Sequence, residues 1–572
     1  MDENVKKAFV AGVERVAAWA DLLDAINVYP VADGDTGRNL SISLFPLRLA
    51  GEKKDPLVRQ LLMAARGNSG NIASQFFSAF YKLTSARRLK EAVQEGNARA
   101  WKAVGNPKLG TMLSVFDALE ETLGDGDFIP EQKNVDKIMS HLERAVHETH
   151  DTLPKLKEAG VVDAGALGMY IFFEGFFYTL AGLDNAYRPV TDVFKDRLQI
   201  SSAFHETAES GYCVDFVVKA DGASADLMKI AGGEESAIVI QEGDFYKVHL
   251  HTEDKEKIKA QMSALGSVLN WEDDNLTTQI AQFSNAPASS GLHIMTDAAG
   301  SLTRDDAKRY GFTLLNSYIN VGDKSLPETY LHPDELYSAM RAGIKVSTSQ
   351  ASVFERHQSY ASVLARFEKV LYLCVGSVFT GNYSVALDWK KEHDPENRLS
   401  VIDTGAASGR LGTIALATQQ YLNHTKDMGK TVAFAKRAVK TCEEYVFLEK
   451  LQYLAAGGRL SKGSAFFGDM LKMKPVISPQ PEGARKVAVV RTRKDQIRLA
   501  QAKLAASLSP ESRALIMLEY SDNAGQVSEF RDKIQGLYPK AVIILQPLSL
   551  TSGAHMGPGT WGVAFLKVQK EN

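Results

Sequence analysis

The sequence predicts a multidomain protein with an all-helical N-terminal domain (1–195), a small α+β middle domain (200–288) and a two-lobed α/β domain (291–572). Near residue 200 the apolar pattern changes from helical spacing to short β-branched and aromatic runs. After the small, polar segment NAPASSG, strand-like runs alternate with helical patterns. The length of 572 residues also exceeds what one hydrophobic core fills, so several domains are expected.

The N-terminal segment is predicted to be helical because its apolar residues recur at helical spacing. The clearest runs are VERVAAWADLLDAI, LVRQLLMAARG, TMLSVFDALEETL and MYIFFEGFFYTLAGL. The longest apolar stretch, from Gly165 to Leu183, contains Glu174 and four glycines. These interruptions favour a buried helix over a membrane span.

The later segments carry strand signals. YCVDFVVKA, SAIVIQEG and FYKVHLHT predict strands of the middle domain. In the C-terminal segment, LHIMTD, VLYLCVG and LSVIDTG are each followed by a helical pattern, which predicts parallel strands with crossover helices. The later runs ALIMLEY and AVIILQP predict a second α/β lobe.

Charge and cysteine content restrict the compartment and the partners. The net charge of −3 comes from nearly balanced acids and bases, which gives no electrostatic reason to expect nucleic acid as a partner. Three widely spaced cysteines form no disulfide framework, and the charged N-terminus lacks the apolar core of a secretory signal. We therefore expect a cytoplasmic protein, and we leave a peripheral contact with a membrane open.

The segment NVYPVADGDTGRNL places Asp33 and Asp35 on either side of one glycine before a predicted helix. Two carboxylates this close repel each other unless a cation lies between them, and Mg²⁺ prefers such oxygen ligands. Asn27 adds a neutral oxygen, and Thr36 and Asn39 could face phosphate. The alternative is a solvated turn, because Asp-Gly is common turn chemistry.

Three further glycine loops precede predicted helices in the same domain. Such loops offer backbone N–H groups at helix starts, which favours a polyphosphate ligand, although each alone is also an ordinary turn. They are ARGNSGNI with Asn68, Ser69 and Gly70, NPKLGTML with Thr111 and Met112, and GVVDAGALG with Asp163.

These four motifs, in this order, closely resemble the ATP-binding subunit of bacterial fatty-acid kinase, which is related to the nucleotide-binding domain of dihydroxyacetone kinase. The resemblance covers about residues 1–195. It implies a helical barrel that binds ATP, with Mg²⁺ held by the catalytic Asp33 and Asp35 and by Asn27. It also implies that the ARGNSG loop contacts phosphate and that Thr111, Met112 and Asp163 lie near the nucleoside.

The middle domain contains a candidate metal site. His249 and His251 are two residues apart on a predicted strand and so share one face, and Cys213 lies on an earlier strand. A thiolate with two imidazoles suits Zn²⁺, whereas a partly exposed strand face is the plainer alternative. YKVHLHTEDKEKI and WEDDNLTTQ resemble the middle domain of the same kinase subunit, which implies zinc at these residues, either structural or assisting phosphoryl transfer.

The C-terminal segment resembles the DegV family, the fatty-acid-binding partner of that kinase. TDAAGSLT, VSTSQAS, VFTGNYSVA, VIDTGAASG, YLAAGGRLSKGSAFFGDMLKMKPVI and HMGPGTWGVAF follow in family order. The resemblance implies an apolar tunnel with a carboxylate at its mouth. The residues expected there are Thr348, Ser349, Thr380, Gly381, Arg459 and His555, of which His555 is also assigned a catalytic role.

Some of these assignments have plainer alternatives. Arg459, and Arg491 or Arg493 in VVRTR, are candidates for the head group or for docking on the kinase, and each is equally well explained as a surface arginine. The family usually has serine at Thr380 and commonly proline at Ala351, which affects the expected acyl-chain preference more than carboxylate binding.

Together these features predict a fatty-acid kinase that transfers the γ-phosphoryl group of ATP to a long-chain fatty acid. The expected cofactors are ATP, Mg²⁺ and a candidate Zn²⁺, and the expected partners are a downstream acyltransferase that uses the acyl phosphate and a second copy in a homodimer. Two alternatives stay open. One is a lipid-binding regulatory protein with an inactive kinase-like domain, and the other is a kinase for a small hydroxylated substrate such as dihydroxyacetone.

Overall fold

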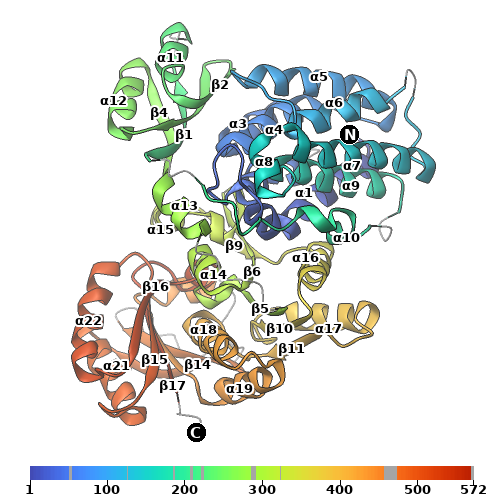
Figure 1. The fold of residues 1–572 in the computed structure, drawn as a ribbon. Helices are drawn as coiled ribbons and strands as arrows, with labels where there is room; N and C mark the ends of the chain where they lie inside the picture. Colours follow the sequence, from blue (N-terminus) through green and yellow to red (C-terminus); the bar gives the residue numbers. More distant parts are fainter. Residues whose placement is uncertain are drawn as a thin grey trace. The chain divides into compact units, whose positions relative to one another are not determined.

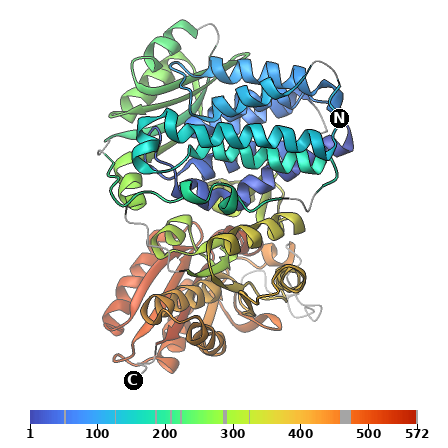
Figure 2. The same cartoon turned by 45° about the vertical axis from the view of Figure 1, so that its right-hand side comes forward.

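The computed structural model describes residues 1–49, 54–124, 127–183, 187–206, 210–220, 224–284, 291–322, 324–456 and 473–568. The chain divides into two compact units, Met1–Asn285 and Ala286–Asn572. Figure 1 and Figure 2 show helices gathered in the first part of the first unit and strands with covering helices in the second. The predicted fold class, with helical, α+β and α/β regions in that order, is confirmed.

The first region of unit 1 is helical. Its helices run side by side in both views (Figures 1 and 2). They are α1 (Glu3–Ala25), α2 (Thr36–Leu44), α3 (Lys54–Ala64), α4 (Gly67–Phe80), α5 (Leu89–Ala103), α6 (Met112–Thr122), α7 (Gln132–Thr152), α8 (Pro154–Ala159), α9 (Ala164–Leu180) and α10 (Val190–Val193).

Helix α9 is the centre of this region, because nearly all of its residues are buried. Its phenylalanines pack against those of α1 and α4; the rings of Phe9 and Phe176, for example, lie 5.1 Å apart. Glu174 forms an ion pair with the buried Arg15 of α1, which neutralises the one acid in this apolar helix. Among the described residues, no helix is both long and apolar enough to cross a membrane.

The second region of unit 1 is a four-stranded antiparallel sheet with strand order β2-β3-β1-β4. Valines and aromatic residues alternate along its strands and pack under two helices, with Val214, Phe216 and Val248 fully buried. Its elements are β1 (Tyr212–Lys219), α11 (Ser224–Ala231), β2 (Glu235–Glu242), β3 (Phe245–Thr252), α12 (Lys255–Leu265), β4 (Ser267–Asn275) and α13 (Leu276–Ser284).

Unit 2 begins with a parallel sheet of order β11-β10-β5-β6 and a small antiparallel sheet of order β8-β7-β9. The alternation of strands and helices predicted this parallel arrangement. The elements are β5 (Leu292–Asp297), α14 (Arg304–Tyr310), β6 (Thr313–Leu315), β7 (Tyr318–Val321), β8 (Lys324–Pro327), α15 (Pro333–Arg341), β9 (Val346–Ser349), α16 (Val353–Arg366), β10 (Lys369–Cys374), α17 (Asn382–His393) and β11 (Leu399–Asp403).

A six-stranded mixed sheet of order β14-β13-β12-β17-β15-β16 forms the second lobe. Helix α18 packs in one core with residues of both large sheets, and α21 and α22 pack on the other face of the mixed sheet (Figure 1). The elements are α18 (Ser408–Thr425), α19 (Met428–Thr441), β12 (Glu443–Phe447), α20 (Gln452–Ala456), β13 (Lys474–Gln480), β14 (Gly483–Val490), α21 (Arg493–Ser507), β15 (Ala514–Tyr520), α22 (Ala524–Leu537), β16 (Val542–Pro547), α23 (Leu550–Met556) and β17 (Trp561–Lys567).

Candidate functional site

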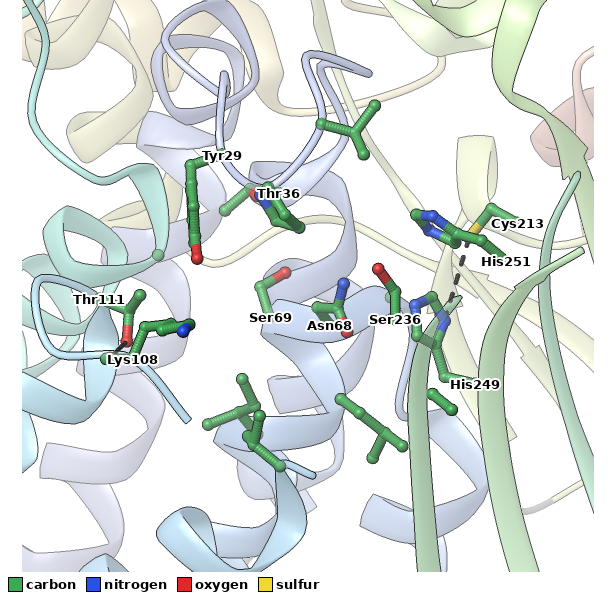
Figure 3. A pocket seen from close by; sticks show the side chains of 18 of the residues that line it. Tyr29, Thr36, Asn68, Ser69, Lys108, Thr111, Cys213, Ser236, His249 and His251 are labelled. Carbon is green, nitrogen blue, oxygen red and sulfur yellow. Dashed lines mark hydrogen bonds between the residues drawn. The ribbon is translucent and has the colours of Figure 1, made fainter. Parts of the chain in front are cut away.

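Unit 1 contains a cavity of about 540 Å³ that collects most of the residues singled out in the sequence. A cavity of this size is in the range of small-molecule and cofactor sites. Figure 3 shows that its lining comes from several helix starts and from strands of the middle sheet. The predicted residues that line it are Asn27, Asp33, Asp35, Thr36, Asn68, Ser69, Thr111, Met112, Asp163, Cys213, His249 and His251.

The aspartate loop lies at the start of α2. Asp33 and Asp35 are each only 8% exposed, and Gly34 between them has φ +65°, a conformation that favours glycine. Asn27 Nδ2 donates to Asp33 Oδ1 at 2.6 Å, and Thr36 Oγ1 donates to Asn27 Oδ1 at 3.0 Å. This set of carboxylate and amide oxygens fits Mg²⁺, which takes hard oxygen ligands and keeps positions for phosphate oxygens.

Two residues that the sequence did not suggest, Glu206 and Lys155, bind the backbone of the aspartate loop. The backbone N–H of Ala32 donates to Glu206 Oε2 at 2.9 Å. Lys155 Nζ donates to the carbonyl oxygen of Pro30 at 2.6 Å and forms an ion pair with Glu206 at 2.7 Å. The loop is therefore held in one position, which suits a site that must bind a cation at fixed geometry.

The ARGNSG loop forms the first turn of α4. Gly67 N–H donates to Asp215 Oδ2 and Gly70 N–H donates to the carbonyl oxygen of Arg66, so the N–H groups of Asn68 and Ser69 are the ones at this helix start that can bind an anion. Two glycines bring this turn close to α2, the helix that follows the aspartate loop. A Cβ added at Gly67 would lie 2.2 Å from Asn39 Nδ2, and one added at Gly70 would lie 2.1 Å from Ser43 Oγ. Both glycines thus allow α4 to pack closely on α2.

The packing of α4 on α2 also determines the surroundings of Asn39 and Gly70, two residues that were predicted to contact the ligand. Asn39 borders a smaller recess next to Gly67, and Gly70 faces Ser43 of α2. Neither is among the described residues that line the large cavity. In the structure, Asn39 and Gly70 instead lie at the contact between α2 and the ARGNSG loop. Asn68 and Ser69 face the cavity directly (Figure 3).

Two further helix starts border the cavity. The side chain of Thr111 caps α6 by accepting from Leu113 N at 3.4 Å, and Asp163 Oδ1 caps α9 by accepting from Ala166 N at 2.7 Å. Burial raises the pKa of Asp163 to about 7. A Cβ added at Gly165 would lie 2.7 Å from Met112 Cε, so this glycine lets the two helix starts meet.

Tyr29, Lys108 and Ser236 are among the cavity-lining residues that sequence reasoning missed (Figure 3). Lys108 is the one cationic side chain among the described residues of the lining. Lys108 lies in NPKLGTML, a segment already selected for its glycine before a predicted helix, so its positive charge could have been noted there. Ser236 belongs to β2, and only tertiary packing brings it to the cavity.

Cys213, His249 and His251 lie together on the middle sheet. In the antiparallel pairing of β1 with β3, Cys213 is opposite His251 and Asp215 is opposite His249. One ligand atom from each of the three residues lies within 4.8 Å of the others, and all three side chains are buried. The set could hold a metal ion, and one thiolate with two imidazoles fits Zn²⁺.

The protonation of these groups is set by burial. Burial lowers the pKa of His251 to about 4, so its imidazole is neutral and can act as a ligand at neutral pH. Burial, together with the nearby Asp215 charge, raises the pKa of the Cys213 thiol well above its usual value. A metal ion bound here would therefore displace a proton from sulfur.

Unit 2 brings two predicted residues from distant parts of the chain into contact. Thr348 Oγ1 of β9 lies 3.0 Å from His555 Nε2 of α23. Both side chains are half-buried, whereas Ser349 is exposed. A hydroxyl and an imidazole in contact at a half-buried position can together bind a carboxylate.

The TGN loop lies beside the same strand end. Asn382 N donates to Thr380 Oγ1 at 3.2 Å, and a Cβ added at Gly381 would lie 3.7 Å from Gln350 Oε1. Asp297 also fixes the position of this loop, because its Oδ1 accepts a hydrogen bond from Asn382 Nδ2 at 2.8 Å. The loop is thus placed next to the TSQ segment that contains Thr348.

The predicted arginines have different outcomes. Arg459 lies outside the described residues. Arg491 is exposed, whereas Arg493 lies over the Trp561 ring at 5.6 Å. Arg491 therefore lies where the surface-arginine alternative expects it, whereas Arg493 packs on an aromatic ring.

Glu328, a buried residue that the sequence did not suggest, holds the start of α23. Its Oε2 accepts from Thr551 N at 3.0 Å, and burial raises its pKa from 4.5 to about 7. The folded protein therefore binds more protons than the unfolded chain between these values. The contribution of this group to stability is complete below about pH 4.5 and is lost as the pH rises through about 7.

Glu328→Gln should remove this pH dependence, because the amide keeps an oxygen acceptor for Thr551 and cannot ionise. We expect the variant to gain stability relative to the wild type as the pH rises from 5 to 8, by up to roughly 3 kcal/mol. Urea unfolding at several pH values measures the difference. The exposed Glu396→Gln serves as the control, and parallel curves for Glu328→Gln and the wild type would contradict the assignment.

Comparison with protein families matches three segments of the chain. Residues 30–178 match the DAK2 domain, and residues 209–283 match the middle domain of the fatty acid kinase A-like family. Residues 291–568 match the DegV family, described as uncharacterised proteins.

Several proteins are similar to the chain over parts of its length. Protein YloV of Bacillus subtilis is 27% identical over 443 residues, which are 69% of this chain and 78% of that protein. An uncharacterised protein of Staphylococcus epidermidis is 32% identical over 302 residues, so the match covers 47% of this chain and 54% of that relative.

A solved structure described as fatty acid binding of a DegV family protein from Thermus thermophilus is 23% identical, with a TM-score of 0.45. It covers 48% of this chain and 99% of that one. A stearic acid-binding protein from Eubacterium ventriosum is 18% identical with a TM-score of 0.44, over 48% of this chain and 98% of its own. The three matched domains follow one another in a single polypeptide, and the chain thus has a fatty acid kinase A-like arrangement made of a DAK2 domain, a fatty acid kinase A-like middle domain and a DegV domain.

Proposed function

We propose that this chain is a fatty-acid kinase that transfers the γ-phosphoryl group of ATP to the carboxylate of a bound long-chain fatty acid, giving acyl phosphate and ADP. The observation that carries the proposal is the cavity of unit 1, where two buried carboxylates, the start of α4 and the caps of α6 and α9 meet. The match to a DAK2 domain supports ATP as the phosphoryl donor, and the match to a DegV domain supports a fatty acid as the acceptor.

The aspartate loop would form the part of the site that binds Mg²⁺ and ATP, the phosphoryl donor. Asp33 and Asp35, with Asn27, would hold Mg²⁺, which when bound neutralises charge on the phosphates. The N–H groups of Asn68 and Ser69 at the start of α4 and the Lys108 ammonium would bind phosphate oxygens, because both offer positive charge at the cavity wall. Thr111, Met112 and Asp163 would contact the nucleoside, as their place on the cavity wall supports.

The acceptor needs no general base. A carboxylic acid with a pKa near 4 to 5 is already ionised at neutral pH, so the chain has only to position it. Thr348 and His555 would hold the carboxylate, and the loop with Thr380 and Gly381 would lie beside them. One bond forms between a carboxylate oxygen and the γ-phosphorus as the bond from that phosphorus to the departing ADP oxygen breaks.

The buried cysteine and histidines border the same cavity, so we assign a metal ion, with Zn²⁺ as the candidate, to the nucleotide site of this kinase. The product, an acyl phosphate, is a reactive acyl donor and would be consumed by an acyltransferase. Transfer requires the two sites to meet, within one chain or between the two copies of a homodimer.

The test is fatty-acid-dependent turnover by the purified full chain. With Mg²⁺, ATP and oleate, we expect ADP release together with an acyl phosphate that hydroxylamine traps as the hydroxamate. Dihydroxyacetone in place of oleate should give no ADP above the background rate. Bound oleate without ADP would instead favour a regulatory lipid-binding protein, and turnover with dihydroxyacetone alone would favour a triose kinase.

A further inference from the structure

Asp215 is a buried acid of the middle sheet that makes contacts in two directions. It lies on β1, two residues after Cys213, and faces the same side of the sheet. Its residue is 7% exposed, and Lys247 Nζ lies 3.2 Å from its Oδ1, so the carboxylate has a buried cation as partner. A paired, buried carboxylate can act as a fixed acceptor for several donors at once.

One direction leads to the candidate metal site. His249 Nδ1 lies 3.1 Å from Asp215 Oδ2 and 4.0 Å from Cys213 Sγ. An ionised carboxylate only accepts and is the nearer partner, so Nδ1 carries the proton and donates to Asp215. This tautomer leaves Nε2 of His249 with a lone pair. Among the described residues, Nε2 is buried and has no hydrogen-bond partner. A carboxylate behind a histidine is the usual arrangement that orients a metal-binding imidazole.

The other direction leads to the phosphate loop. The backbone N–H of Gly67 donates to Asp215 Oδ2 at 2.8 Å, and Asn71 Nδ2 donates to Oδ1 at 3.1 Å. Gly67 is the first residue of α4, directly before Asn68 and Ser69, which face the cavity. The same Oδ2 atom therefore accepts from the metal-site histidine and from the first residue of the phosphate loop.

We propose that Asp215 is a positioning residue that couples metal binding at Cys213, His249 and His251 to nucleotide binding at the start of α4. The proposal rests on the proposed function in that it takes the cavity as a nucleotide site. A metal ion bound through the unpartnered Nε2 of His249 would fix that ring, and the shared carboxylate oxygen would then fix the backbone of Gly67. Because such coupling is reciprocal, bound nucleotide should strengthen metal binding by the same factor.

Asp215→Asn is the informative substitution, because the amide has the same shape but a single oxygen acceptor. It cannot accept from His249, Gly67, Asn71 and Lys247 as the carboxylate does. Asp244→Asn is the matched control, since Asp244 is an exposed acid in the turn between β2 and β3 of the same sheet. Both variants are compared with the wild-type full chain, stripped of metal and reloaded.

The measurements are metal affinity and its effect on nucleotide affinity. Cobalt ion is titrated into the stripped chain and followed by thiolate-to-cobalt absorbance, and Mg·ADP binding is measured by calorimetry with and without zinc. Asp215→Asn should weaken cobalt binding by about 10- to 100-fold. Zinc should tighten Mg·ADP binding by at least about fivefold in the wild type and in Asp244→Asn, but by less than about twofold in Asp215→Asn.

A wild-type measurement keeps the proposal testable if Asp215→Asn does not fold. Zinc added to the stripped wild type without nucleotide should slow amide hydrogen exchange in peptides that cover residues 66–71. Unchanged exchange there would overturn the proposal, as would an Asp215→Asn variant with the wild-type coupling factor. None of these readouts uses a fatty acid. Intact coupling in a chain that never phosphorylates oleate would therefore reject the proposed kinase reaction and leave the role of Asp215 standing.

Discussion

Replacing Asp33 or Asp35 with alanine should abolish fatty-acid-dependent ADP release, with a loss on the order of 10³-fold or more. Each substitution removes a buried carboxylate of the aspartate loop, and with it a ligand that would hold Mg²⁺ against the phosphates. The loss should appear in kcat, because charge neutralisation acts mainly in the transition state. A coupled ADP assay with oleate measures it.

The control for these variants is Asp226→Ala, which removes an exposed acid in the first turn of α11. Oleate binding by Asp33→Ala and Asp35→Ala should equal that of the wild type, because the predicted lipid site lies in unit 2. Normal turnover in either aspartate variant would refute the metal assignment. Loss of oleate binding together with turnover would show instead that the substitution unfolds the chain.

Replacing His555 with alanine should weaken oleate binding by roughly 10- to 100-fold, since a hydrogen bond to a charged group contributes about 1.5–3 kcal/mol. His555 lies 3.0 Å from Thr348, so Thr348→Val should act in the same direction, and the double variant should lose less than the sum of the two free energies. Titration with a fluorescent fatty acid and competition by oleate measure the affinities.

The exposed His424→Ala, in the last turn of α18, should bind oleate like the wild type. The substitutions of His555 and Thr348 should leave Mg·ATP binding unchanged, because both residues belong to unit 2. Strictly additive effects of the two substitutions would indicate that the residues do not share one carboxylate. Unchanged oleate affinity in His555→Ala would remove this residue from the head-group site.

The fold class followed from local patterns because those patterns report burial. The phenylalanine-rich run of α9 was expected to be a buried helix, and in the structure its rings pack on α1 and α4. The strand-and-helix alternation after residue 291 predicted parallel pairing, which β5, β10 and β11 form. Strand order was beyond such patterns, because it depends on contacts between segments far apart in the chain.

The candidate site was predictable where its residues lie in one short segment. Asp33 and Asp35 flank one glycine, and Gly67 is the first residue of α4, so each motif could be interpreted from its own segment. Asp215 carried no such signal. A single acid in a strand becomes informative only when the sheet places it opposite His249 and against Gly67.

The sequence by itself determined the order of the three regions, the aspartate loop, the glycine-rich helix starts and the H-x-H strand, because each depends on neighbouring residues and on their periodicity. Only the tertiary structure decided that the loops and the strand border one cavity, that Asn39 and Gly70 face a neighbouring helix, and that Thr348 meets His555. The physical reason is that packing between distant segments fixes which side chains share a space, and no local spacing contains that information.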